Sequence, residues 1–512
     1  KYIINSNSNI DFTYRPSFNH INQDPSDINN TAYETYYDER RDFFLENAIF
    51  FNTPMQIFYS RRIGGIEKNV DNYSSFLTKL ESAAKYTYKN DKTNYGLLLA
   101  YSKPSSFRDL PYTYDIYSSV IRFSRKIVSN KHNIGFIGTN SSNKNIDSNV
   151  YGLDYSLNFI NNQLYIDSQI AYSDTQFDLG KGSNFEIGYR TNSLKFLDKV
   201  FFIDCWISNN KYNKSFNLND LGYLFRNNLN EYNFGLSFSD EQSLIKTNFI
   251  IQYYFAKNFS DDILSDIISF KYNLSFKNSS YLIVGVSKEF DHFNDRYYDY
   301  FFNLDLEKVI KAPNNNTINI EYGNDLRKDL SYTANIKSFK NNINDKGNNY
   351  VFDINYNVNN WTELNFSYDL LEYYETYHFL KIRQLPNGIN FTPSVFINIR
   401  NQYQYLFTNS NNKEIYYTAK ISSYLDKLTL QLYSEYYLYQ NNWNENDNVY
   451  KVSVNDANYT YPNPVNTEST SLIDYDVDKI LYSAFYSSIN LNFVIQWNFL
   501  ENSNIYFLYR LN

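Results

Sequence analysis

The sequence FDINYNVNNWTELNFSYDL, residues 352–370, contains two runs in which apolar and polar side chains alternate, separated by the polar pair Asn359–Asn360. Side chains of a β-strand point to opposite faces in turn, so each run has one apolar face and one polar face. The same alternation recurs along most of the chain, for example at 234–238 and 428–432. Long, aromatic and numerous runs of this kind are typical of a transmembrane β-barrel, although a soluble sandwich shows the same period.

The composition supports this interpretation. The chain has 512 residues, 54 Tyr and 41 Phe, and its net charge of -8 is spread along the sequence. A nucleic-acid-binding protein would carry a basic stripe, so we expect no nucleic-acid partner. No apolar run approaches the roughly 18–20 residues of a membrane helix. A chain that spans a membrane without such a helix has to close its sheet into a barrel, because only then is every backbone polar group paired.

The alternating segments predict an all-β fold: a single closed antiparallel transmembrane β-barrel of about 24 strands, within a range of roughly 22–26. Residues 1–75 have weaker periodicity and are expected to form an entry strand at Ser8–Tyr14, followed by a plug or seam segment in the lumen or on the periplasmic side. Residues 76–512 are expected to form the barrel. The side chains expected to face lipid are Leu236, Phe352, Leu364, Leu428 and Leu430, and those expected to face the lumen are Asp353, Asn355, Asn365, Asp369 and Gln431.

One part of the strand series is ambiguous. The expected strands include 217–227, 297–309, 361–373, 376–385, 394–408, 413–424, 427–440, 479–498 and 503–511. Since both termini of a barrel normally face the periplasm, this series places the long segment 441–478 on the periplasmic side, where connections are usually short. The run Val449–Val454 alternates and is a candidate for an additional strand that would remove the conflict.

Two blocks near the N-terminus carry a family resemblance. ERRDFFLEN at 39–47 is followed by FFN at 50–52, and residues 58–64 read FYSRRIG. With the entry strand and a Trp-containing strand near the C-terminus, these blocks resemble the Bacteroidota outer-membrane barrel family known as domain of unknown function 5916, although Asp42 stands where that family usually has Pro.

The resemblance implies an integral protein of the bacterial outer membrane. Its neighbours would then be outer-membrane lipid and lipopolysaccharide, and its candidate partners other outer-membrane or periplasmic proteins. The resemblance implies no known activity. Many members carry an upstream domain similar to family-9 carbohydrate-binding modules, which is not found in this sequence, so no sugar-binding function carries over.

The same blocks supply the candidate functional residues, which are Glu39, Arg40, Arg41, Glu46, Arg61 and Arg62. Their charges cannot face lipid, and the adjoining phenylalanines cannot stay in water as one patch. The barrel interior or an adjoining wall gives both groups partners, so we expect the arginines to pair with Glu39 and Glu46. Two roles remain open: a latch that closes the barrel, and an element that gates or selects solutes.

No arrangement for catalysis stands out. The four histidines are His20, His132, His292 and His378. His292 lies beside Asp291 and Asp295, and His378 lies near Glu375; we interpret both as solvated hairpin tips. We therefore expect no enzyme, no metal and no cofactor. The leading function is a passive or gated conduit for a solute or polymer across the outer membrane. The alternatives are a non-conducting scaffold or subunit of a larger outer-membrane assembly and, third, an outer-membrane hydrolase.

Overall fold

The computed structural model describes residues 2–16, 33–68, 75–104, 114–128, 131–144, 147–175, 179–191, 194–196, 199–296, 298–299, 304–305, 310–312, 314–341, 346–384, 403–443, 449–453, 459–460, 469–470, 484–500 and 503–511. The chain forms two compact units. The first comprises Lys1–Leu194, Phe202–Leu236 and Tyr254–Asp261, and the second comprises Lys195–Phe201, Ser237–Tyr253 and Asp262–Asn512.

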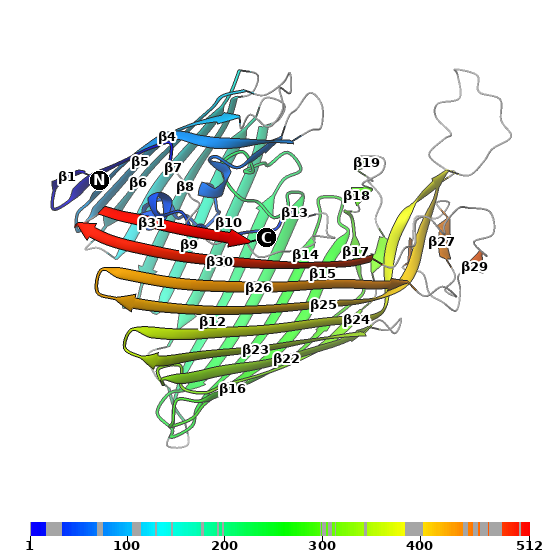
Figure 1. Cartoon of the computed structure of the whole chain (residues 1–512). Coiled ribbons are helices and arrows are strands. Elements are labelled where there is room, and N and C mark those ends of the chain that lie inside the picture. The colour runs from blue at the N-terminus through cyan, green and yellow to red at the C-terminus, as the bar shows by residue number, and fades with distance from the viewer. Residues whose placement is uncertain are drawn as a thin grey trace, which may run out of the picture. The chain divides into compact units, whose positions relative to one another are not determined.

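The first unit is built on one antiparallel ladder (Figure 1). Its strands are β1 (Tyr2–Asn5), β2 (Ser8–Tyr14), β4 (Ser75–Lys89), β5 (Thr93–Pro104), β6 (Ile116–Ile127), β7 (His132–Ser142), β8 (Asp147–Phe159), β9 (Leu164–Asp174), β10 (Leu179–Arg190) and β12 (Lys199–Tyr212), paired in that order. The remaining elements wholly within this unit are β3 (Ile66–Lys68), α1 (Asp42–Leu45) and the 3-10 turns η1 (Ala48–Phe51) and η2 (Ser60–Arg62). Like β12, three further strands have residues in both units: β11 (Leu194–Phe196), β13 (Leu229–Asp240) and β14 (Lys246–Lys257).

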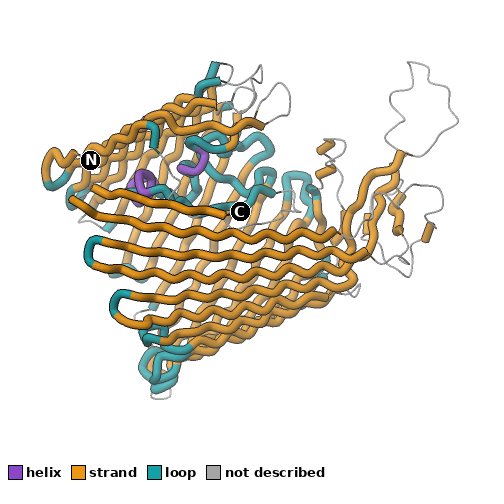
Figure 2. The backbone as a smooth tube through the Cα atoms, in the orientation of Figure 1, coloured by secondary structure: helices purple, strands orange, loops and turns teal. Residues whose placement is uncertain are grey.

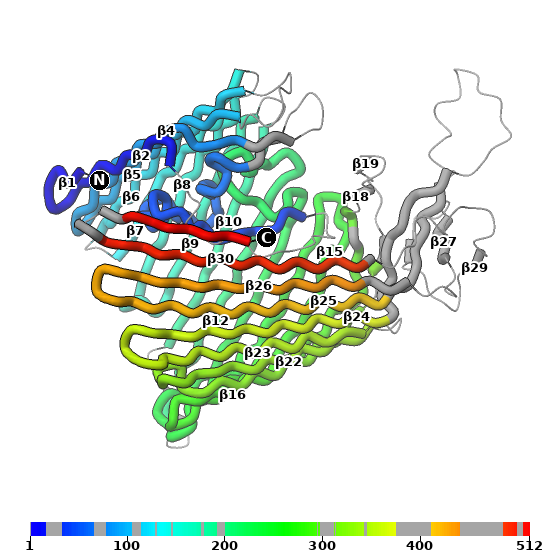
Figure 3. The backbone as a smooth tube through the Cα atoms, in the orientation of Figure 1, coloured from blue at the N-terminus to red at the C-terminus, as the bar shows by residue number. Residues whose placement is uncertain are grey.

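The second unit contains another antiparallel ladder, and Figure 3 shows that strands adjacent in sequence lie side by side in it. In order of pairing its strands are β15 (Ile263–Ser275), β16 (Tyr281–Glu289), β21 (Asn315–Gly323), β22 (Leu330–Asn341), β23 (Lys346–Asn359), β24 (Thr362–Gln384), β25 (Tyr403–Leu425), β26 (Leu428–Trp443), β30 (Ala484–Leu500) and β31 (Ser503–Leu511). Short strands complete the list: β17 (His292–Asn294), β18 (Tyr298–Asp299), β19 (Leu304–Asp305), β20 (Ile310–Ala312), β27 (Val449–Ser453), β28 (Tyr459–Thr460) and β29 (Ser469–Thr470).

The register of the second ladder places apolar and polar residues on opposite faces. Phe352 on β23 pairs with Tyr368 on β24, whereas the next residue, Asp353, pairs with Ser367. Because paired residues share a face, the apolar row continues from strand to strand. It includes Val286, Ile320, Ile336, Phe352, Phe366, Ile421, Leu432, Phe493 and Phe507, of which every member is exposed. The all-β class predicted from the alternation is therefore confirmed. The strand number and the closure of the sheet stay predictions.

The first ladder also has two different faces, but only one of them is open. Alternate residues such as Leu99, Ile121, Leu153 and Ile170 remain 49–63% exposed. The residues between them belong to the hydrophobic core of this unit: Ala83, Leu98, Ala100, Val120, Ile137, Val150 and Ala171. A segment from the N-terminus covers this second face. Figure 2 shows the short helical turns of this segment in purple beside the orange strands.

Several strand predictions are confirmed. The entry strand Ser8–Tyr14 is β2, with the predicted bounds. The run 449–454 contains β27, which pairs with the far end of β25. The connection 444–483 leaves the ladder at the same end as 385–402, because Asn441 of β26 pairs with Ala484 of β30. Short turns such as Asp426–Lys427 lie at the opposite end. The sequence left the end of 441–478 open, and the pairing shows that this connection begins at the end of the ladder opposite the short turns.

Other strand predictions are wrong. Residues 361–373 and 376–385 form one strand, β24, and the region of 394–408 that the structure describes is continuous with 413–424 in β25. Register shifts occur at 373/376 and at 379/381, and the first of them coincides with the predicted gap between two strands. Residues 217–227 form a loop instead of a strand. Within the described residues, no helix is long and apolar enough to cross a membrane.

Candidate functional site

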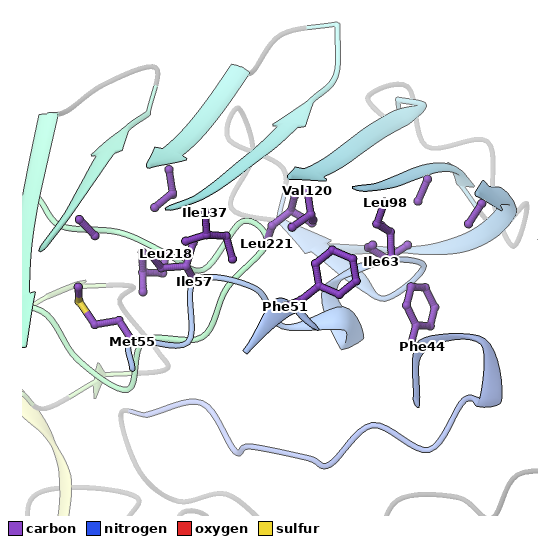
Figure 4. Close-up of a cluster of buried hydrophobic side chains, with 14 of the residues drawn as sticks. Phe44, Phe51, Met55, Ile57, Ile63, Leu98, Val120, Ile137, Leu218 and Leu221 are labelled. Carbon is purple, nitrogen blue, oxygen red and sulfur yellow. The ribbon is translucent and has the colours of Figure 1, made fainter. Parts of the chain in front are cut away.

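The candidate site is the N-terminal segment, residues 33–65, where it packs on the covered face of β4–β9. Its buried side chains are Phe44, Phe51, Met55, Ile57 and Ile63, with Ile57 0% and Ile63 1% exposed. The 213–228 loop adds Phe216, Leu218 and Leu221 to the same cluster. Figure 4 shows the segment and loop side chains pointing toward Leu98, Val120 and Ile137 on the strands. The segment is thus part of the core of this unit.

Glycines on the covered face allow this close approach. A Cβ atom at Gly96 on β5 would lie 2.8 Å from the Phe51 ring, and one at Gly152 on β8 would lie 2.4 Å from Cδ1 of Ile57. Neither distance is compatible with van der Waals packing of close-packed interiors. Each glycine therefore provides the space for one apolar side chain of the segment.

Arg41 and Glu39 form a buried ion pair that organises the segment. Arg41 Nη2 lies 2.6 Å from Glu39 Oε2, and its Nε donates to Oε1 at 2.8 Å. The same guanidinium donates to the backbone carbonyls of Ser60 and Ile63, both at 2.6 Å. Its carbon also lies 4.3 Å from the centre of the Phe44 ring. Arg41 therefore ties the beginning of the segment to its end, with all of its charge matched by oxygen acceptors.

The electrostatics of Glu39 follow from this pairing. Burial alone would raise the pKa of the Glu39 carboxyl, but the hydrogen bonds and positive charge of Arg41, with a hydrogen bond from Ser60, outweigh it and lower the pKa. Glu39 is therefore held as a carboxylate.

Arg62 connects the segment to the 213–228 loop. Its two terminal nitrogens donate to the two carboxylate oxygens of Glu34 at 2.7 Å each, and its Nε donates to the carbonyl of Gly222 at 3.0 Å. Tyr223 donates to the backbone carbonyl of Glu34 at 2.8 Å. A Cβ at Gly222 would lie 2.7 Å from the carbonyl oxygens of residues 56 and 57, so the loop backbone lies directly against the segment.

Polar side chains of strands β4 and β9 form hydrogen bonds to the backbone of the segment. Lys85 on β4 is 1% exposed, and its ammonium donates to the carbonyls of Phe43 and Glu46, the latter at 2.6 Å. Asp11 of β2 lies 3.8 Å from the same ammonium. On β9, the fully buried Gln169 accepts a hydrogen bond from the backbone N–H of Met55 at 2.6 Å. The carbonyls that end α1 and one orphan N–H of the segment are thereby satisfied.

A cluster of tyrosines packs where the segment meets the 213–228 loop. Tyr36 stacks on Tyr59 with ring centres 5.0 Å apart and meets Tyr223 edge-on at 5.0 Å. The Tyr59 hydroxyl donates to the carbonyl of Tyr37 at 2.6 Å. Burial raises the pKa of Tyr59 to about 12. Tyr59 is therefore neutral, and the cluster contributes packing and hydrogen bonds.

The candidate residues thus lie together on one segment but differ in their contacts. Arg41 pairs with Glu39, as the sequence suggested, whereas Arg62 pairs with Glu34. Glu46 offers its backbone carbonyl to Lys85. Arg40 donates its backbone N–H to Glu39 Oε1 at 3.0 Å. Arg61 lies over the Tyr37 ring at 5.9 Å, and burial lowers its pKa.

Sequence reasoning missed the partners supplied by the sheet and the loop, namely Glu34, Lys85, Gln169 and Gly222. The available signal was the row of small residues at alternate positions of neighbouring strands, Ala83, Gly96, Ala100, Gly152 and Ala171, which permits close packing on an otherwise polar face. Among the described residues, no group of three or more His, Cys, Asp and Glu is placed to hold a metal ion.

Comparison with solved structures finds large proteins of low similarity. The chain is similar to the FrpB iron transporter of Neisseria meningitidis in its apoprotein form, with 9% identity, a TM-score of 0.37, and coverage of 83% of this chain and 72% of that chain. It is also similar to the siderophore receptor PirA from Acinetobacter baumannii, with 7% identity, a TM-score of 0.40, and coverage of 82% and 79%. The copper transporter OprC is also similar, with 8% identity, a TM-score of 0.36, and coverage of 84% of this chain and 71% of that chain. Similarity of this degree carries no functional information.

No curated protein matches the chain. A family model does match: it is described as "Domain of unknown function (DUF5916)" and covers residues 1–95 and 123–512. The match includes both blocks from which the resemblance was inferred, 39–52 and 58–64, and nearly all of the two ladders. The resemblance is confirmed, and the chain belongs to the DUF5916 family.

Proposed function

We propose that the protein is an integral outer-membrane β-barrel in which the N-terminal segment narrows a conduit for solutes. The observation that carries this proposal is the face on which the segment lies. It covers one face of β4–β9, and the opposite face keeps its leucine, isoleucine and tyrosine side chains exposed. Such a contiguous apolar face is unfavourable in water and favourable against lipid, and the other face of a closed barrel lines the lumen.

The polar face of the second ladder supports a water-filled interior. Ser367 donates to Asp353 at 2.5 Å, Asn349 donates to Asp369 at 2.7 Å, and Tyr416 donates to Glu435 at 2.7 Å. These bonds run across neighbouring strands on the face opposite Phe352 and Phe366. Carboxylates at these positions need water or hydrogen-bond donors, which a lumen provides and lipid does not.

The segment is placed to act as a gate because both of its ends are tied to neighbouring strands. It follows β2 and precedes β4, and these two strands pair directly, for example Tyr14 with Ser82. The segment therefore stays with the wall when its contacts loosen. Its contact with the 213–228 loop depends on Arg62 and Glu34, which are more exposed than the Arg41–Glu39 pair. We place the moving contact there.

Conductance in planar lipid bilayers tests the proposal. Replacing Arg62 with Ala should raise the conductance, because the loop and segment lose their shared hydrogen bonds, and should shift the selectivity toward cations, because a positive charge leaves the lumen. The same change at Arg61 should shift selectivity in the same direction. Arg125→Ala is the matched control, since Arg125 is exposed and lies on the apolar face of β6. An equal effect of both changes, or no effect of Arg62→Ala in a folded protein, would contradict the gate.

A non-conducting scaffold or subunit is the second candidate. It is favoured by the density of the packing, since Ile57, Ile63 and Met55 are at most 3% exposed, as are core residues of the strands such as Leu98 and Ile137. Under this alternative neither the wild type nor Arg62→Ala conducts, and the protein purifies from membranes with other proteins in constant ratio. Under the conduit proposal the purified chain alone conducts.

A further inference from the structure

A groove lies on the apolar face of the first ladder, away from the N-terminal segment. Its volume is about 330 Å³. The floor is formed by small side chains of neighbouring strands, Ser82, Ala84 and Ser119, and the rim by the larger side chains Phe12, Leu99, Tyr101 and Tyr117. Phe12 is 64% and Tyr117 56% exposed, so the rim projects from the sheet while the floor is recessed. The groove is open and mainly apolar.

Two lysines lie beyond one end of this groove. Lys79 of β4 and Lys103 of β5 are directly opposed cross-strand partners. They alternate with the buried Leu80 and Ser102, so both point to the same face as Tyr101 and the groove. Like charges placed directly opposite each other destabilise a sheet unless an anion lies between them. Within the part of the chain that the structure describes, neither lysine has a carboxylate at ion-pair distance, and the Lys103 ammonium lies 5.5 Å from the centre of the Tyr101 ring.

Two acidic side chains near the lysines, Glu81 and Asp115, already accept hydrogen bonds from other residues. Glu81 accepts from Arg15 at 2.5 Å. Asp115 accepts from the Tyr101 hydroxyl at 2.7 Å. Among the described residues, no carboxylate is therefore paired with the two lysines, which form a positive site at the border of an apolar groove.

The lysines lie at the end of the ladder that carries the long connections. Residues 105–115 join β5 to β6 at that end, whereas Asn90–Lys92 alone join β4 to β5 at the other end. The 213–228 loop leaves β12 at the same end as the lysines. In bacterial barrels the short turns are periplasmic and the long loops extracellular. The lysines would then lie at the outer leaflet.

We propose that this surface binds one lipid with a phosphorylated headgroup, with the phosphate between Lys79 and Lys103 and an acyl chain in the groove. The proposal rests on the membrane location proposed above. Two lysine ammonium groups on one face suit an anion, and phosphate is a common anionic group of lipid headgroups. The apolar groove selects a lipid over a soluble phosphate, because only a lipid fills it.

Native mass spectrometry of the purified full chain in detergent tests this site, with diphosphorylated lipid A as the probe. The double variant Lys79→Gln/Lys103→Gln should bind the probe with an affinity at least about tenfold lower, since the headgroup loses two basic side chains that face it. Lys92→Gln/Lys126→Gln is the matched control, because both lysines are exposed and lie at the short-turn end of β5 and β6. Its affinity should equal that of the wild type. Ser119→Phe, which fills the groove, should weaken binding without changing charge.

Three results would overturn the proposal: equal weakening by the two double variants, equal affinity for dephosphorylated lipid A, or displacement of the probe by millimolar inorganic phosphate. The last would assign the lysines to a soluble anion. Conductance of the same variants separates this proposal from the proposed function. A chain that inserts and conducts but binds the probe without dependence on Lys79 and Lys103 overturns only the lipid site, whereas a chain that does not insert overturns the membrane location.

Discussion

The carboxylate of Glu39 and the guanidinium of Arg41 form a two-point ion pair between residues only two positions apart, and both side chains are almost entirely buried. The pair forms within one turn of chain, yet Arg41 also reaches the carbonyls of Ser60 and Ile63. A local contact thus determines how the two ends of the segment meet. Removing either partner leaves the other as an uncompensated buried charge.

We expect Arg41→Leu to release the segment at much lower urea concentration than in the wild type. Losing one member of a buried ion pair costs about 3–5 kcal/mol, because the remaining charge stays buried. The measurement is the rate of protease cleavage between residues 33 and 65 as urea increases. Arg15→Leu is the control: Arg15 also pairs with a glutamate but is largely exposed, so its loss should leave the cleavage midpoint unchanged. Equal midpoints for the two variants would contradict the role of Arg41.

Acidification should release the same segment. The pKa of Glu39 is lower in the folded protein than in the unfolded chain, so its contribution is fully present above its ordinary carboxyl pKa and is lost as the pH falls through the folded value. Protease cleavage of the segment should therefore be slow at neutral pH and faster in strong acid. Glu39→Gln should make cleavage faster at neutral pH and remove most of its dependence on pH. A pH dependence that is identical in this variant would show that another group is responsible.

Gly152→Ala should destabilise the docked segment. The added methyl group would lie 2.4 Å from Ile57 and 2.9 Å from Nε2 of Gln169, both of which are fully buried. Overpacking of a filled core costs about 1–3 kcal/mol. Gly285→Ala on β16 is the control, since its methyl group would meet nothing closer than 3.7 Å. Thermal unfolding in detergent should show a lower midpoint only for Gly152→Ala, and an equal fall for both would contradict the packing described here.

Two neighbouring residues on β24 test the assignment of faces. Leu364 lies on the apolar face with Tyr356 and Ile421, and Asn365 lies on the polar face. Arg at a lipid-facing position near the membrane midplane costs about 2–4 kcal/mol, and much less on the luminal side. Leu364→Arg should therefore lower the stability measured by folding into lipid vesicles, while Asn365→Arg should not. A larger loss for Asn365→Arg would show that the faces are reversed.

The sequence determines the strands where one face is apolar and the other polar. In β2 the period of two is set by side chains within the strand, and the predicted bounds agree with the structure. In β24 the start is predicted to within one residue, but the strand continues past the predicted end at 373. The 213–228 loop escapes prediction because Phe216, Leu218 and Leu221 are buried by the N-terminal segment, which is more than one hundred residues away in sequence. Polar residues such as Asn411 continue β25 although they suggest a turn, because backbone pairing with β26 holds them.

The candidate site shows the same division. Arg41 and Glu39 are near neighbours, and their pairing follows from their charges and from the surrounding apolar block. The Arg62–Glu34 pair needs residues separated along the chain to meet, and the anchoring by Gln169 needs the fold of β9. Those contacts depend on the tertiary structure, and no local pattern encodes them.

The hairpin of β24 and β25 has a consequence for how far the protein reaches. Each strand has 23 residues and the two remain paired from Thr362–Ser423 to Gln384–Tyr403, with only two register shifts. A strand of this length measures about 75 Å. Crossing a membrane takes about 9–11 strand residues. In the proposed outer-membrane orientation, with the short turn Asp426–Lys427 at the periplasmic surface, more than half of the hairpin would stand outside the bilayer as a hydrogen-bonded arm.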